Sequence, residues 1–192
     1  MRVCTIASGS SGNCVFVSAG GTHVLIDAGI SCRRIAAALK GLGVGLGDLS
    51  AVLITHEHAD HVAGLATMTK NYPIPLYAAA PTLEAMRHRL PRIMGKLIPV
   101  TAGERADIGA MAVTAFATSH DAAASVGYAI AAGGRKMALA TDLGFVSEEV
   151  CRGVAGADLL ICETNHDVDW LRSGPYPYYL QQRILGDPGH LS

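Results

Sequence analysis

The sequence predicts an α/β protein in which two β-sheets are each covered by helices. Short apolar runs alternate with longer segments of helical periodicity along the whole chain. Half of the 192 residues are apolar but only 5% are aromatic, so aliphatic side chains must fill the core. Polar residues, especially histidine and aspartate, recur directly after the apolar runs. The chain is long enough for one well-packed core, and we expect residues 1–192 to form a single domain.

The composition argues against several classes of protein. The formal net charge of −1 gives no electrostatic sign of nucleic-acid or membrane binding, although a local basic patch can exist within a neutral total. No signal-peptide pattern is present, and no apolar run approaches the roughly 18 residues of a membrane helix. The five cysteines form no C-x-x-C pattern, and most lie in apolar runs, which favours reduced, buried thiols. We therefore expect a soluble, cytoplasmic protein.

The first half of the chain is predicted to contain strands separated by helices. Ser31 is a candidate N-cap for a helix that runs to residue 40, with Gly41 as its stop. A proline at position 81 suits the start of another helix. The expected strands are residues 2–6, 14–18, 24–26, 51–54 and, as a short edge strand, 75–78; the other expected helices are residues 62–71 and 81–90, with Pro91 after the second.

The second half is richer in strands. Gly133 and Gly134 form a hairpin signature between two of them, and Ser147 is a candidate N-cap for a helix to about residue 152. An amphipathic helix is expected over residues 175–185, where its tyrosines are either partly buried or free to stack on bases. The expected strands are residues 97–100, 104–108, 111–118, 125–131, 136–140 and a buried strand at 158–162.

The stretch Thr-His-Glu-His-Ala-Asp-His at residues 55–61 predicts a metal site. It follows a short buried strand and precedes a helix. His56 and His58 are two apart in extended chain, so they point the same way and can bind one ion. Asp60 and His61 lie where the chain turns into the helix and face a different point. Imidazole and carboxylate suit zinc and similar divalent metals, and this geometry suggests two adjacent ions.

Other polar residues follow apolar strands in the same way. Asp27, His120, Asp142 and Glu163 each come after a predicted strand, and His166 lies between Asn165 and Asp167. Residues just past strand ends gather along one edge of an α/β protein, where active sites form. The loop at residues 8–13 is rich in Ser, Gly and Asn. It is either a hairpin turn or a site whose hydroxyls and N–H groups hold a phosphate.

Together these residues resemble the metallo-β-lactamase fold superfamily. The pattern consists of His-x-His-x-Asp-His, a histidine about sixty residues later and an aspartate about twenty beyond it. The resemblance implies a four-layer αβ/βα sandwich with two divalent ions, zinc or manganese or else iron. It places His56, His58 and His120 on the first ion, and Asp60 and His61 on the second. Asp142 would bridge both ions, and Asp27 would support the ligands from behind.

Three further segments are similar to the YycJ (WalJ) branch, which is related to tRNase Z and RNase J and is regarded as containing DNA 5′–3′ exonucleases. These segments are residues 7–13, 163–167 and 175–192. The resemblance implies phosphodiester hydrolysis of DNA by a water that two metals activate, with Asp60 orienting it. His166 is the candidate to protonate the leaving oxygen or hold the phosphate, with His190 as a second candidate. Alternatively, His166 is a loop residue fixed by its polar neighbours. The candidate substrate contacts are Ser8, Ser10, Asn13 and His190.

Two other functional classes remain open from the sequence. The same metals would serve hydrolysis of a thioester, a lactam or another ester, because activating a nucleophile does not determine which electrophile it attacks. A non-catalytic regulatory or binding protein on the same fold is the third class. The superfamily has a seventh ligand, a histidine near the C-terminus. We expect it to lie beyond Ser192, so that the final segment of the fold is missing, unless His166 or His190 supplies it.

Overall fold

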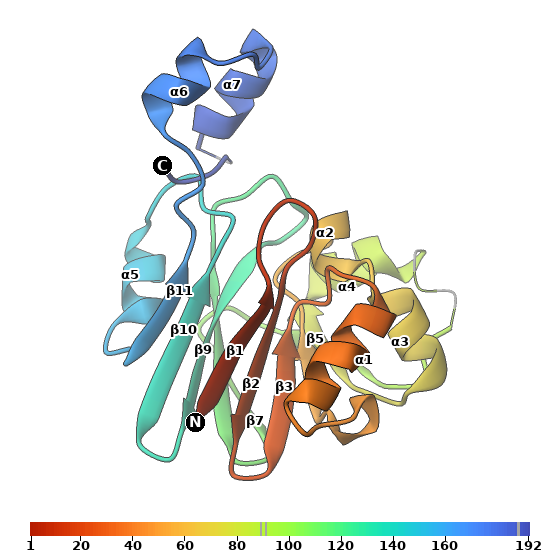
Figure 1. Cartoon of the computed structure of the whole chain (residues 1–192). Coiled ribbons are helices and arrows are strands. Elements are labelled where there is room, and N and C mark those ends of the chain that lie inside the picture. Colours follow the sequence, from red (N-terminus) through yellow and green to blue (C-terminus); the bar gives the residue numbers. More distant parts are fainter. Residues whose placement is uncertain (89, 91, 188) are drawn as a thin grey trace.

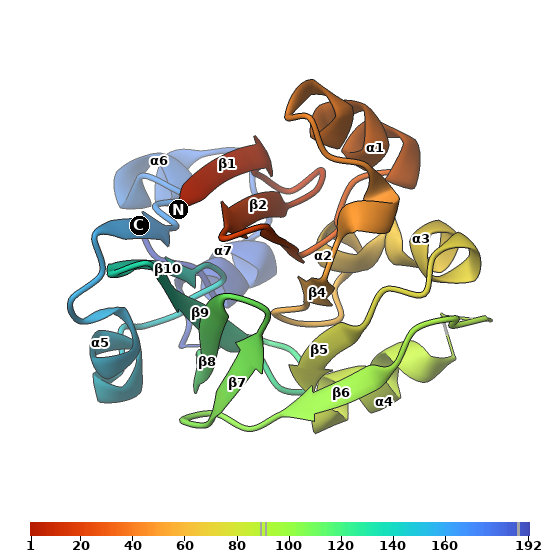
Figure 2. The same ribbon diagram turned by 90° about the horizontal axis from the view of Figure 1, so that it is seen from below.

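The computed structural model describes residues 1–88, 90, 92–187 and 189–192. Two β-sheets face each other in the described chain, and helices cover their outer faces (Figures 1 and 2). The predicted α/β architecture with two sheets is confirmed. None of the described helices is long and apolar enough to cross a membrane.

The first sheet mixes antiparallel and parallel strands. Its order is β1-β2-β3-β4-β5-β6, and pairing is antiparallel up to β3 and parallel from β3 onward. The expected edge strand at residues 75–78 is wrong, because β5 lies between β4 and β6; Pro75 precedes the strand, so its missing N–H interrupts no pairing. The bounds are β1 Arg2–Ala7, β2 Cys14–Ala19, β3 Thr22–Ile26, β4 Ala51–Leu53, β5 Leu76–Ala79 and β6 Leu97–Val100.

The second sheet has the order β11-β10-β9-β8-β7. Its strands are antiparallel except for β11, which pairs in parallel with β10 at the edge. The prediction that the strand at 158–162 is buried is wrong. Leu159 and Leu160 are 44% and 47% exposed, because helix α5 (Glu148–Val154) packs over β8, β9 and β10. The bounds are β7 Arg105–Ile108, β8 Met111–Ala117, β9 Val126–Ala132, β10 Arg135–Ala140 and β11 Leu159–Cys162.

Two helices in the first half of the chain differ from the predicted ranges. The expected helix at 62–71 is two helices, because Gly64 packs against the backbone of Ile30 and begins the second one. The expected helix at 81–90 ends at Arg87, and positions 89 and 91 lie outside the described residues. The helix bounds in this half are α1 Cys32–Gly41, η1 Leu46–Asp48, α2 Ala59–Val62, α3 Leu65–Asn71 and α4 Ala80–Arg87.

The C-terminal helices α6 (Val168–Ser173) and α7 (Tyr178–Leu185) form a pair beyond the end of the sheets (Figure 1). Helix α6 was not predicted. Asp167 caps it by accepting a hydrogen bond from the Trp170 N–H at 2.7 Å. Helix α7 begins at residue 178 rather than 175, because Pro177 occupies its N-cap position. Helix α5 (Glu148–Val154) begins after the predicted Ser147 cap.

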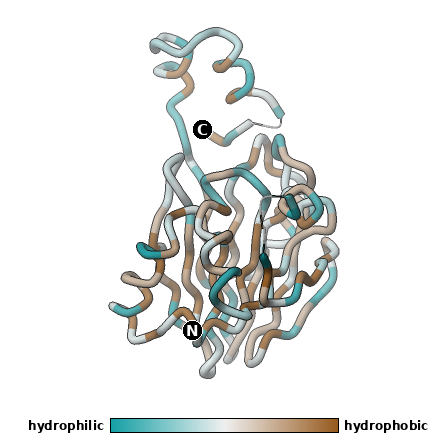
Figure 3. Tube along the Cα trace, turned by 90° about the vertical axis from the view of Figure 1, so that its right-hand side faces the viewer, coloured by the Kyte–Doolittle hydropathy of each residue, from teal (hydrophilic) through white to brown (hydrophobic). Residues whose placement is uncertain are grey.

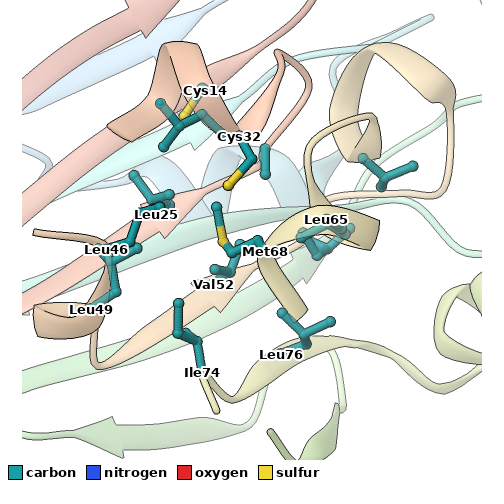
Figure 4. Close-up of a cluster of buried hydrophobic side chains, with 14 of the residues drawn as sticks. Cys14, Leu25, Cys32, Leu46, Leu49, Val52, Leu65, Met68, Ile74 and Leu76 are labelled. Atoms are coloured by element: carbon teal, nitrogen blue, oxygen red, sulfur yellow. The ribbon is translucent and has the colours of Figure 1, made fainter. Parts of the chain in front are cut away.

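Two apolar layers form most of the core. On β3, Leu25 faces the layer under helices α1 and α3, whereas Val24 and Ile26 face the layer between the sheets. Figure 4 shows the helix-side layer, where Leu25 and Val52 of the sheet meet Met68 of α3. Brown, hydrophobic stretches run through the body of the molecule in Figure 3. Fully burying each such aliphatic side chain stabilises the fold by roughly 1.5–3 kcal/mol.

Three loops meet at Gly29 beside the end of β3. The Gly29 N–H donates to the Asn13 carbonyl at 2.7 Å, and the Asn13 N–H donates to the Asp60 carbonyl at 2.7 Å. A Cβ atom at Gly29 would overlap the Asp60 carbonyl, so only glycine allows this close backbone approach. Residue 29 thereby fixes the position of the loop that contains Asp60.

We predict that Gly29→Ala lowers the free energy of unfolding by about 2 kcal/mol or more, because the backbones of residues 29 and 60 must separate. Gly41→Ala is the matched control, since a Cβ there meets no atom of the described residues within 4 Å. It should leave stability unchanged or raise it by up to about 1 kcal/mol. Urea unfolding in the presence of chelator measures both. Equal midpoints for the two variants would contradict the close-approach argument.

The five thiols divide by burial. The expectation that most are buried is wrong for Cys151, on the solvent side of α5, and for Cys162, on the edge strand β11, because both are exposed. Cys14 and Cys32 are buried, and Cys4 is partly exposed. Burial, together with the nearby negative charge of Asp27, raises the pKa of the Cys14 thiol to about 12.

We predict that iodoacetamide at pH 8 alkylates Cys151 in the folded chain and leaves Cys14 untouched. The thiolate is the nucleophile, and at this pH only roughly one Cys14 in ten thousand is ionised. Peptide mass spectrometry after a timed reaction measures the modification at each site, with the urea-unfolded chain as the control in which Cys14 reacts. Equal labelling rates for the two thiols in the folded chain would contradict the prediction.

Candidate metal centre

Strand ends from both sheets converge at the side of the molecule beneath α6 and α7 (Figure 1). Asp27 follows β3, the histidine stretch follows β4, and Asp142 follows β10. Asp27 and Asp142 both have left-handed backbone conformations, with φ of 60° and 57°. Such conformations are unfavourable for most residues other than glycine but are tolerated by aspartate. Each carboxylate is thus turned back towards the same centre at the point where its strand stops.

Four imidazole rings gather at this centre. The ring centroids of His56 and His58 are 4.5 Å apart, and His56 lies 4.1 Å from His61 and 4.8 Å from His120. One ring nitrogen each of His56, His58 and His120 fall within 4.8 Å of one another. A second group of donors within the same distance consists of His56, His61 and Asp142. His56 therefore belongs to both groups, and the two candidate ion positions are adjacent.

Carboxylates flank the imidazoles on one side. The Nε2 atom of His61 lies 3.3 Å from Oδ2 of Asp142 and 3.4 Å from Oδ2 of Asp60. The Asn13 amide nitrogen reaches the same place, 3.1 Å from His61 Nε2 and 3.3 Å from Asp60 Oδ2. The side-chain oxygen of Asn13 accepts a hydrogen bond from the Gly9 N–H. Asn13 consequently links the loop at residues 8–13 to the histidine stretch.

Asp27 lies behind the imidazoles and is almost fully buried. Its carboxylate accepts hydrogen bonds from the Thr55 N–H and the Thr55 hydroxyl, each at 2.9 Å. The same carboxylate is 2.8 Å from Nδ1 of His61. This contact directs the opposite nitrogen, Nε2, towards Asp60 and Asp142. Carboxylates behind metal-binding histidines orient them and fix the tautomer in this way.

The local charges favour opposite protonation states at neighbouring rings. Burial lowers the pKa of the His56 imidazole far below its ordinary value, and the adjacent positive His61 lowers it further. Burial also acts to lower the pKa of His61, but the carboxylates of Asp27, Asp60 and Asp142 together outweigh it and raise that pKa to about 10. Burial raises the pKa of Asp142. Without a cation at the centre, His61 provides the compensating positive charge near these carboxylates.

The donor set fits divalent metal. Among the described residues, Nε2 of His56 is buried at this centre without a hydrogen-bond partner. Leaving buried polar atoms unpaired is costly, and an ion at the centre is the partner that imidazole nitrogens and carboxylate oxygens share. The lowered pKa of His56 and of His120 keeps both rings neutral, which is the form that binds metal.

His190 reaches the centre from the C-terminal segment. Its Nδ1 atom is 3.0 Å from Glu163 Oε2 and 3.5 Å from Asp142 Oδ1, and its ring centroid is 5.2 Å from that of His120. Donor atoms of His120, Asp142 and His190 form a third group within 4.8 Å. The buried Glu163 carboxylate also accepts hydrogen bonds from the N–H groups of Leu143 and Leu191. Glu163 therefore ties the C-terminal segment to the loop after Asp142.

A cleft of about 570 Å³ opens over this centre. Its floor includes His58, Asp60 and His120, and its far wall is formed by α6 and α7. His166 lines the cleft, and both of its ring nitrogens are buried without a hydrogen-bond partner in the part of the chain that the structure describes. A neighbouring hollow of about 330 Å³ is bordered by the loop containing Ser8 and Ser10. The candidate metal centre is therefore accessible from a hollow large enough for a small molecule.

The structure brings the sequence-predicted site residues together around the two hollows. The metal candidates lie within the clusters described above, and Ser8, Ser10, Asn13 and His190 border the second hollow. Sequence reasoning named Thr55 and Glu163 near the site but gave neither a partner, and it missed Trp170. Only the capping pattern Asp-x-x-Trp at residue 167 offered a signal for the last of these.

Comparison with known proteins places the chain in a family. The model of the beta-lactamase superfamily domain matches residues 22–192. Exodeoxyribonuclease YycJ of Bacillus anthracis and exodeoxyribonuclease WalJ of Streptococcus pneumoniae are each 38% identical to this chain, over 97% of it and 71% of the relative. The Zn²⁺-bound PqqB structure from Methylobacterium extorquens aligns with a TM-score of 0.72 and 27% identity, over 86% of this chain and 64% of that one.

The family and the fold agree with the geometry. The two-sheet αβ/βα architecture is that of the metallo-β-lactamase fold, and divalent metal binding accompanies this fold in the Zn²⁺-bound neighbour. The donor groups described above lie at the sheet ends where the cleft opens. This chain belongs to the beta-lactamase superfamily and, within it, groups with the YycJ and WalJ proteins.

Proposed function

We propose that this chain is a metal-dependent phosphodiesterase that degrades DNA from the 5′ end. The observation that supports this proposal is the set of imidazole and carboxylate donors on the floor of the 570 Å³ cleft, in a chain 38% identical to two proteins named exodeoxyribonuclease. Because the overall charge is only −1, affinity for DNA should depend on few phosphate contacts.

Two ions would occupy adjacent positions in the donor set. His56, His58 and His120 would hold the first ion, while Asp60 and His61 would hold the second. Asp142 would bridge them, since its two oxygens face His61 at 3.3 Å and His120 at 3.9 Å. Zinc and manganese suit these ligands best, and iron is also compatible. Asp27 would keep His61 Nε2 directed at the second ion through its 2.8 Å contact with Nδ1.

The ions, when bound, would lower the pKa of a water and stabilise the charge that develops on the phosphate oxygens. Asp60 is partly exposed at the cleft floor, so its carboxylate can accept a proton from that water and orient it. Burial acts to raise the pKa of Asp60, but the hydrogen bond and charge of His61 lower it below its ordinary value. The carboxylate therefore stays ionised, as a proton acceptor and metal ligand must be.

His166 is the candidate for the leaving group. Its two ring nitrogens have no hydrogen-bond partner among the described residues, although both are buried in the cleft wall. A substrate phosphate would supply the missing partner. In the protonated form the ring would then donate its proton to the departing 3′ oxygen. His190 and the hydroxyls of Ser8 and Ser10 border the second hollow and would contact the substrate beyond the scissile bond.

We predict that His58→Ala reduces bound metal by about one ion per chain, because the first position loses one of three imidazoles. The fold should persist, since its apolar core does not include the site. The matched control is His88→Ala, whose side chain is exposed at the end of α4. Elemental analysis of the purified variants measures the metal, and circular dichroism the fold. Full metal content in the folded His58 variant would refute this ligand assignment.

We predict that the chain with added Mn²⁺ or Zn²⁺ degrades 5′-phosphorylated DNA and leaves nitrocefin intact. Chelator should abolish the reaction, and Asp142→Asn should lower its rate by at least about a hundredfold, because the bridging charge is lost. Asp107→Asn, in an exposed strand of the second sheet, is the control that should retain full rate. Denaturing gels that resolve product length follow the reaction. Cleavage of nitrocefin or of a thioester without action on DNA would overturn the proposed substrate class.

A further inference from the structure

Two aromatic side chains stand in the wall of the cleft with much of their surface in water. Trp170 of α6 is 57% exposed, and Tyr176 of the α6–α7 turn is 38% exposed. Both line the same cleft as His58 and His120. Their ring centroids are 5.7 Å apart at an interplanar angle of 75°. In an edge-to-face pair the faces of the edge-on ring are not covered by its partner, so aromatic surface remains free to stack.

The backbone beneath these rings is well anchored. Asp167 caps α6 by accepting a hydrogen bond from the Trp170 N–H at 2.7 Å, and the neighbouring Leu171 is 1% exposed. The side-chain amide of Gln181 donates to the Tyr176 carbonyl at 2.9 Å. The rings therefore keep a defined position while their faces stay uncovered. Uncovered aromatic surface on an ordered support is typical of a binding site rather than of a core.

A positively charged side chain lies in the same wall of the cleft. Arg183 of α7 lines the cleft, and its guanidinium is 3.1 Å from the carboxylate of Asp121, which directly follows His120. Both side chains of this pair are about 60% exposed, so the guanidinium keeps donors free for a second acceptor. An aromatic pair beside an arginine combines a stacking surface with a phosphate contact, the two elements that recognise single-stranded nucleic acid.

From this juxtaposition we infer that Trp170 and Tyr176 form a stacking platform for an unpaired base at the end of the DNA strand, with Arg183 on the adjoining phosphate. The inference rests on the proposed function, because it names the part of the DNA that the site takes. A cleft of 570 Å³ is within the size range of small-molecule sites and admits one or two nucleotides rather than a base-paired end. The terminal nucleotide must therefore leave its partner strand before it reaches the metal centre.

The chain offers a direct probe of this contact. Trp170 is the single tryptophan in the sequence, so intrinsic fluorescence reports on this ring alone. In chelator, so that no hydrolysis occurs, the full 192-residue chain is titrated with a 5′-phosphorylated thymidine oligonucleotide. A second titration uses the same strand with abasic nucleotides at its 5′ end, which keeps every phosphate. We expect quenching by the first strand and a Kd at least about tenfold weaker for the abasic strand.

Variants separate stacking from general apolar contact. Binding is measured by the anisotropy of a 3′-labelled strand, because the tryptophan is replaced. Trp170→Leu should weaken binding about tenfold, whereas Trp170→Phe should restore most of it, since only the second keeps an aromatic face. Tyr178→Leu and Tyr179→Leu are the matched controls: both tyrosines are 74% exposed, and neither lines the cleft. These controls should bind as tightly as the unaltered chain.

The outcomes distinguish this inference from the proposed function. Hydrolysis of bis-p-nitrophenyl phosphate with added metal tests the phosphodiesterase activity, and this substrate contains no nucleobase. If that hydrolysis occurs but the intact and abasic strands bind equally, the stacking platform is refuted and the phosphodiesterase stands. If hydrolysis fails but the base-dependent quenching is present, the platform stands and the phosphodiesterase is refuted. Absence of quenching by the intact strand, or equal loss of binding in the Tyr178 and Trp170 variants, also refutes the platform.

Discussion

The carboxylate of Asp27 binds the segment that contains the histidines to the end of the sheet. It accepts hydrogen bonds from the N–H and the hydroxyl of Thr55 and contacts Nδ1 of His61, all at 2.8–2.9 Å. A buried carboxylate is stable only when its oxygens are paired in this way. The buried Asp27 carboxylate needs these hydrogen-bond partners, and this need fixes the position of His61 and of the loop before it. The glycine contact at residue 29 adds a second constraint on the same loop.

The cluster of imidazoles imposes a second condition. The rings of His58, His61 and His120 each lie within 4.8 Å of the His56 ring, and the four cannot all be protonated without mutual repulsion. The low pKa of His56 and the high pKa of His61 are the arrangement that the protein alone can reach. A divalent ion resolves the same conflict differently, because it supplies positive charge and needs neutral rings. The site is thus arranged for a cation at its centre.

The fold class could be predicted because the apolar runs along the chain have the period and length of strands. The histidine stretch at residues 56–61 and the aspartates after β3 and β10 were also evident, since local chain geometry decides where they point. The exposure of β11 could not be predicted from the sequence, because it depends on which strands α5 covers. The contact of His190 with Glu163 joins residues 27 apart, and no local pattern encodes such a pair.

The segment with α6 and α7 leaves the body after Glu163 and returns at His190, and these two residues contact each other at 3.0 Å. Gly144 adds a second fastening, since a Cβ there would overlap the backbone of Asp187. These two contacts therefore hold the two ends of the segment together where it joins the body. Its length and its side chains can change through evolution without moving the groups beneath it. Exposed side chains of α6 and α7 can thereby alter contacts with the substrate while the metal-donor groups stay in place, and His166 is the residue of the segment that also belongs to the bond-breaking step.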